Sequence, residues 1–115
     1  MLLKDLVGGV EVINRLVKVE VSPRVAYKLH QFATIFESDI AFFNTEREKI
    51  LNAHGIKSGD KYTISEINVS LVRDKLESLG SLEIDKKFPR INVDDIPIKL
   101  TVEDIHRIAF LLEDS

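Results

Sequence analysis

Residues 22–55 have the sequence SPRVAYKLHQFATIFESDIAFFNTEREKILNAHG, which predicts one uninterrupted helix from Pro23 to His54. Ser22 can accept a hydrogen bond from the first free backbone N–H groups, and proline fits the first helical position, where no N–H is needed. Gly55 suits a left-handed stop after the last turn. Both ends of the helix are therefore encoded in the sequence.

Apolar residues recur along this stretch at spacings of three and four, which indicates one continuous apolar face. They are Val25, Leu29, Phe32, Phe36, Ile40, Phe43, Ile50 and Leu51. Such a helix is roughly 48 Å long at about 1.5 Å per residue, whereas a compact chain of this size has a radius of gyration near roughly 13 Å. We therefore expect one end of the helix to project, or to pack on another subunit.

Ile35 and Phe42 fall to one side of this main face and close to each other. At about 100° per residue they form a second, narrower apolar patch. Either another helix of the same chain covers this patch, or it contacts a subunit or a partner protein. The two residues are therefore the candidate partner-binding residues.

Shorter helices are predicted on both sides of the long one. The first extends from Leu3 to Lys18, or ends near Leu16 before an extended link, because residues 17–21 alternate in the manner of a short strand. Another begins after Ser65 and continues to Gly80, and it can pack antiparallel on the long helix. Its apolar residues are Ile67, Leu71, Val72, Leu76 and Leu79.

Extended segments are predicted in three further places. Residues 58–60 are Ser-Gly-Asp, which favours a turn, and the β-branched and aromatic run after them favours a short strand. Residues 81–85 and 90–93 alternate as strands do, and residues 96–100 add another extended piece. Pro97 places that last piece at an edge of the sheet or outside it.

A final helix is predicted to begin after Thr101, because Asp104 follows three positions later and completes a capping arrangement. Its apolar residues continue to Leu112. The acidic side chains of Glu103 and Asp104 complement the helix dipole in the first helical turn, which explains their position without a role as metal ligands.

The overall pattern predicts one domain that spans residues 1–115 and belongs to the α+β class, dominated by helix. One long amphipathic helix packs with shorter helices and a small sheet. The chain is 44% hydrophobic and 30% charged, contains no cysteine, and has no apolar run long enough to span a bilayer. The absence of cysteine excludes disulfides and thiolate chemistry, and we expect a soluble protein that does not enter a membrane.

Nucleic acid is not an expected partner, because the net charge is −3 and acidic and basic residues alternate along the chain. The densest basic patch comprises Lys86, Lys87 and Arg90, with Phe88 among them. Phe88 there is compatible with base stacking. A solvated strand end before Pro89 is the favoured interpretation.

No catalytic signature is present. The sequence lacks a Gly-x-Ser-x-Gly elbow and a phosphate-binding loop, and its three histidines are isolated from one another. We therefore expect no catalytic residue and no cofactor. One local concentration of oxygen and nitrogen ligands remains as a candidate metal site, and it comprises Asp94, Asp95, Glu103 and His106.

The layout of the whole chain resembles small uncharacterised proteins of bacteriophages and prophages. The resemblance is carried by residues 26–29 (Ala-Tyr-Lys-Leu), which open the long helix, and by residues 47–51 (Arg-Glu-Lys-Ile-Leu), which close it. It continues through His54-Gly55, the extended residues 96–100 and a terminal helix that ends at residues 110–114. The resemblance implies a viral origin, and it assigns no catalytic residue.

The leading hypothesis is a non-enzymatic phage protein that binds another protein or itself. It would be a virion or assembly component, or an inhibitor of a host factor, and would lie in the host cytoplasm or in the virion. The alternative is a small-ligand binding protein or enzyme with a site near Asp94, Asp95, Glu103 and His106, at the start of the C-terminal helix. That alternative requires a concave pocket.

Overall fold

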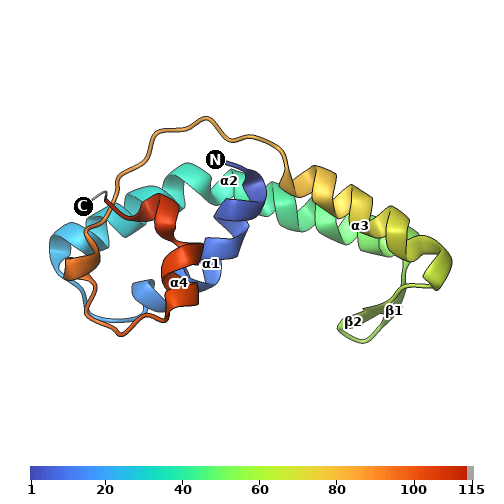
Figure 1. Cartoon of the computed structure of the whole chain (residues 1–115), viewed down its shortest axis with the longest axis horizontal. Helices are drawn as coiled ribbons and strands as arrows, with labels where there is room; N and C mark the ends of the chain where they lie inside the picture. The colour runs from blue at the N-terminus through green and yellow to red at the C-terminus, as the bar shows by residue number, and fades with distance from the viewer. Residues whose placement is uncertain (114–115) are drawn as a thin grey trace.

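Helix α2 (Pro23–His54) passes through the whole length of the molecule in the computed structural model, which describes residues 1–113 (Figure 1). Its predicted ends are confirmed, since Pro23 occupies the first turn and the Ser22 hydroxyl accepts a hydrogen bond from the Val25 N–H at 3.3 Å. The predicted apolar face is also confirmed. Val25, Leu29, Phe32, Phe36 and Leu51 are buried.

Three elements pack against the first half of α2 and form the body of the molecule (Figure 1). They are α1 (Leu3–Val17), α4 (Val102–Arg107) and the short 3₁₀ helix η2 (Ala109–Leu111). Leu6, Val12 and Leu16 of α1 meet Ile108 and Leu111 in the core, and all five are at most 2% exposed. The link after α1 forms no strand, so α1 ends close to the predicted position.

The second half of α2 carries only one further layer. Helix α3 (Glu66–Gly80) packs antiparallel along it, after a hairpin formed by β1 (Ile56–Ser58) and β2 (Lys61–Thr63) (Figure 1). We call this part, residues 42–82, the arm. The molecule is accordingly elongated, with extents of 49 × 29 × 24 Å and a Cα radius of gyration of 16.5 Å.

The hairpin corrects two details of the sequence-based expectation. Residues 56–58 form a strand that pairs with residues 61–63, and Ile56 lies opposite Thr63. The turn therefore joins two strands, whereas the sequence predicted a single strand after it. Gly55 is extended, with φ −125° and ψ 169°, and not left-handed. Glycine is nevertheless required there, because a Cβ atom would lie 2.8 Å from the Leu51 carbonyl oxygen.

Residues 81–101 return from the arm to the body as a segment that forms no strand and holds one short 3₁₀ helix, η1 (Val93–Asp95), and it is visible as the long orange stretch in Figure 1. The strands predicted at 81–85 and 90–93 are wrong, because this segment makes only isolated bridges, from Leu2 to Glu83 and from Ile91 to Leu112. Six of its apolar side chains pack against the helices and find no partner strand, whereas Leu82 and Val93 are exposed. Half-buried or buried residues of this kind are Ile84, Phe88, Ile91, Ile96, Ile98 and Leu100.

Phe88 is therefore not part of a solvated strand end. Its ring centroid lies 5.7 Å from that of Phe32 and 5.3 Å from that of Phe36, and Phe110 completes the cluster at 6.1 Å from Phe88. Edge-to-face and tilted arrangements of this kind stabilise a core beyond the burial of area alone. The cluster joins the return segment to α2 and to η2.

The C-terminal helix begins as predicted and ends earlier. The Thr101 hydroxyl accepts a hydrogen bond from the Asp104 N–H at 3.0 Å, and the Asp104 carboxylate accepts one from the Thr101 N–H at 3.2 Å. Helix α4 then stops at Arg107, and η2 replaces the expected continuation to Leu112. Asp114, the last residue of the predicted terminal helix, lies outside the described residues.

Candidate functional site

An exposed apolar surface with a concave shape lies on the arm, between α2 and α3. We call it the arm groove. It has a volume of about 660 Å³ and is open to solvent along its length. Its lining residues are Phe42, Glu46, Ile50, Leu71, Asp74, Lys75, Ser78, Leu79 and Leu82.

Three large side chains of the arm groove remain open to solvent. Phe42 is 47% exposed, Leu71 42% and Leu82 47%. Contiguous apolar residues at a protein surface mark binding sites more often than isolated ones do. The arm groove is therefore the surface of this chain best suited to contact another molecule.

The exposure follows from how α3 packs. Of its 15 residues only Val72, Leu79 and Gly80 are buried, although its sequence carries further apolar residues. These lie on a second side of the helix, where Ile67 is 90% exposed and Leu71 is 42% exposed. The sequence already indicated that part of α3 would be exposed, because its apolar residues cover too wide an arc for all of them to face α2.

Three charged side chains line the arm groove: Glu46, Asp74 and Lys75. Glu46 pairs with Lys49 on the same helix at 3.0 Å. Asp74 and Lys75 are neighbours on α3, and within residues 1–113 neither has an ion-pair partner. The arm groove thus presents one carboxylate and one ammonium group side by side.

The structure separates the two residues predicted as a partner-binding patch. Phe42 lines the arm groove, whereas Ile35 is half-buried against the core and lines a shallow depression with Tyr27, His30, Gln31 and Thr34. The return segment runs along α2 and past Ile35, with Leu82 beside Phe42 in the arm groove and Phe88 beside Phe36. Its Lys86 ammonium group donates to the Ile35 carbonyl oxygen at 3.3 Å and to the Asp39 carboxylate at 2.7 Å.

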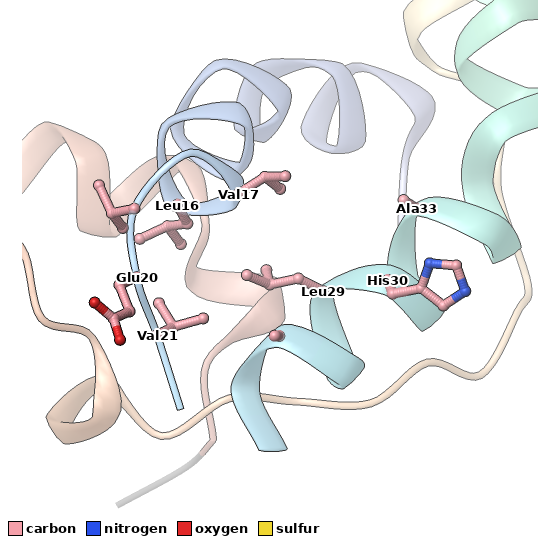
Figure 2. A pocket seen from close by; sticks show the side chains of 9 residues that line it. Leu16, Val17, Glu20, Val21, Leu29, His30 and Ala33 are labelled. Atoms are coloured by element: carbon pink, nitrogen blue, oxygen red, sulfur yellow. The ribbon is translucent and has the colours of Figure 1, made fainter. Parts of the chain in front are cut away.

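A more enclosed apolar pocket lies in the body, between the end of α1, the α1–α2 link and the first turns of α2 (Figure 2). Its volume is about 410 Å³, within the range of small-ligand sites. The aliphatic side chains of Leu16, Val21 and Leu29 point toward one another, while Glu20 and His30 lie at its opposite ends (Figure 2). This pocket suits a small apolar ligand or an aliphatic side chain of a partner.

The candidate metal ligands are not gathered into a site. No three histidine, aspartate or glutamate side chains in the described part of the chain are close enough together to hold a metal ion. Glu103 is engaged by Arg107 at 2.7 Å. His106 lines a depression of about 380 Å³ between α1 and α4.

Among residues 1–113, one carboxylate is buried, and it belongs to the body and acts structurally. Asp104 is 7% exposed, and the Arg15 guanidinium donates a hydrogen bond to it at 2.6 Å. The Arg15 hydrogen bond, followed by the Thr101 backbone N–H, holds the pKa of Asp104 below its ordinary value. This pair joins α1 to α4.

Comparisons of the chain with protein-family models, with curated proteins and with solved structures gave no match. Among residues 1–113, no helix is long and apolar enough to cross a membrane.

Proposed function

We propose that this chain is a non-enzymatic protein that acts by binding another protein through the arm groove. The observation that supports the proposal is the exposure of Phe42, Leu71 and Leu82 on one concave surface of a projecting two-helix arm. Large apolar side chains at the centre of a groove are typical anchors of protein interfaces. A helical groove suits an apolar helix face or an apolar segment of the partner.

The layout that resembles small phage and prophage proteins suggests the biological setting. In that setting the chain would serve as a virion or assembly component, or as an inhibitor of a host factor, in the host cytoplasm or in the virion. The arm projects from the body (Figure 1), and the arm groove lies at its base, beside Leu82.

Phe42→Asp tests the proposal. The substitution is expected to abolish partner retention, because it places a charge among the exposed apolar side chains of the arm groove. Folding should be preserved, with a loss of stability of no more than about 1 kcal/mol, because Phe42 is 47% exposed. The measurement is capture by the immobilised protein from phage-infected and uninfected host lysates, with identification of the retained proteins by mass spectrometry.

Val102→Asp provides the matched control, because Val102 is 74% exposed on the body and lies outside the arm. It should retain the same proteins as the original chain. Equal retention by Phe42→Asp would count against the arm groove as the binding surface. Unfolding of Phe42→Asp, seen as loss of the cooperative thermal transition, would show that Phe42 belongs to the core.

The body pocket supports a second candidate function, binding of a small apolar ligand. Its enclosure between Leu16, Val21 and Leu29 is the observation that favours it. A ligand present at one hundred times its dissociation constant should stabilise the fold by about 2.7 kcal/mol. Thermal melting with medium-chain fatty acids and alcohols tests this, and Ala33→Leu, which fills the pocket wall, should remove any shift.

A further inference from the structure

We infer that the body pocket takes a small primary amine with a linear aliphatic chain, and that the ammonium group of this ligand pairs with Glu20. The inference rests on the second candidate function, ligand binding in the body pocket, and names the class of ligand. It does not depend on the arm groove, because the two surfaces share no lining residue.

The body pocket has room for a ligand because α2 carries alanines where it faces the α1–α2 link. Ala26 and Ala33 both line the pocket, and at about 100° per residue a spacing of seven places them on the same side of the helix. Their methyl groups leave space that a leucine would fill. The pocket also has a closed floor, because the side chains of Leu16 and Leu29 are 2% and 3% exposed.

The walls of the body pocket suit an aliphatic chain. The link contributes Val19 and Val21, and Val17 at the end of α1 is 59% exposed beside them. No phenylalanine or tyrosine of residues 1–113 lines the pocket. An aliphatic chain bound there would remove valine and leucine surface from water, which is favourable.

The charge of the pocket lining favours a cationic head group. Glu20 lines the pocket, and no lysine or arginine of residues 1–113 does so; Lys18, two residues earlier, lies outside the lining. Glu20 forms no salt bridge within the described residues, so its carboxylate is available to a ligand. His30, the other ionisable group of the lining, lies at the opposite end (Figure 2). A carboxylate at one end of an apolar cavity attracts an ammonium group and repels the carboxylate of a fatty acid.

Isothermal titration calorimetry of the full chain with hexylamine, hexanol and hexanoate at neutral pH tests the inference. The three probes share one aliphatic chain and differ in the charge of the head group. Hexylamine should bind at least about threefold more tightly than hexanoate, a modest ratio because Glu20 is exposed and its ion pair is screened by water. Ala33→Leu, which fills the pocket wall, should abolish binding of all three probes.

Charge reversal at Glu20 tests the pairing itself. Glu20→Lys should invert the preference, so that hexanoate binds at least about threefold more tightly than hexylamine. Binding of hexanol should be nearly unchanged, because the aliphatic walls stay as they are. The variant is expected to fold, since Glu20 is exposed in a link between helices, and circular dichroism checks this.

Glu48→Lys provides the matched control. It makes the same change of net charge at an exposed position of the arm, outside the body pocket. It should keep the preference of the original chain for hexylamine. Inversion of the preference in Glu48→Lys would show that net charge selects the head group and would overturn the pairing with Glu20.

Equal affinity of the original chain for hexylamine and hexanoate would also overturn the inference, as would an unchanged preference in Glu20→Lys. If hexanol still binds in these cases, ligand binding in the body pocket stands and only the assignment of an amine is lost. If none of the three probes binds the original chain, the second candidate function fails together with the inference.

The protein-binding function of the arm groove is tested separately. Glu20→Lys should retain the same lysate proteins as the original chain, because Glu20 does not line the arm groove. Loss of these proteins from Glu20→Lys would place the protein contact at the body pocket and would overturn the small amine as its ligand.

Discussion

Gly8 and Gly9 are neighbours in α1 and have opposite surroundings. A Cβ atom at Gly9 would lie 2.8 Å from the Arg107 carbonyl oxygen and 2.9 Å from the Phe110 ring, whereas a Cβ atom at Gly8 would meet nothing within 4 Å. The helix continues through both residues. Gly9 is thus required by the close approach of the C-terminal part of the chain, and Gly8 is not.

Alanine substitutions should therefore have opposite effects at the two positions. Gly8→Ala should raise the free energy of unfolding by about 0.5–1 kcal/mol, because glycine is unfavourable in a helix interior. Gly9→Ala should lower it by about 1–3 kcal/mol, because the backbone at Arg107 must shift. Urea denaturation of the two variants measures both changes, and an equal effect of the two would contradict the packing of Gly9.

Residue-level reasoning from the sequence predicted caps better than contacts. Ser22 and Thr101 were identified correctly, because a cap depends on neighbours close in the chain. Phe88 was wrongly predicted to lie at a solvated strand end, since its burial depends on the path of a distant segment. For Ile35 the sequence left open whether the same chain or a partner covers it, and the structure shows it half-buried against the core. The arm groove shows the same difference between local and distant contacts. The sequence indicated Phe42 as a candidate contact residue, but it did not indicate Leu82, which reaches the groove from a distant part of the chain.

At the scale of elements, the predicted fold class is confirmed and its sheet is smaller than expected. The long helix, α3 and the start of α4 follow from periodicity and capping, which are local signals. The alternation in residues 81–85 and 90–93 predicted strands that do not form. Alternation records which side chains are buried, and here helices bury them instead of a second strand.

The contact between α1 and α4 should make stability depend on acid. The pKa of Asp104 is lowered, so its contribution to stability is fully present above the unfolded-state pKa, about 4, and is lost as pH falls through the folded-state value. Asp104→Asn should therefore be less stable than the original chain near neutral pH. The difference should shrink below about pH 4.

Arg15→Gln tests the cause of this dependence, because the Arg15 hydrogen bond is the main reason for the lowered pKa. This variant should show a weaker loss of stability between about pH 5 and about pH 2, measured by urea denaturation at several pH values. The same acid sensitivity in Arg15→Gln and in the original chain would contradict that assignment.

The whole molecule is longer than a compact chain of its size, as the length of α2 predicted. Its Cα radius of gyration is 16.5 Å, against roughly 13 Å for a compact domain. Small-angle X-ray scattering of the chain, at a concentration where sedimentation shows a monomer, should give a value close to the larger figure. A value near the smaller figure would show that the arm folds back onto the body in solution.

The arm leaves the body along α2 and returns beside its own point of departure. The Leu3 N–H donates to the Leu82 carbonyl oxygen at 2.8 Å, and a Cβ atom at Gly80 would touch Lys4, so the end of α3 is fixed against α1. The arm consists of the second half of α2 and of α3, which pack along each other and are connected through the hairpin. Inserting or deleting one helical turn in both α2 and α3 would therefore change the length of the arm by about 5.4 Å. The contacts within the body would stay the same.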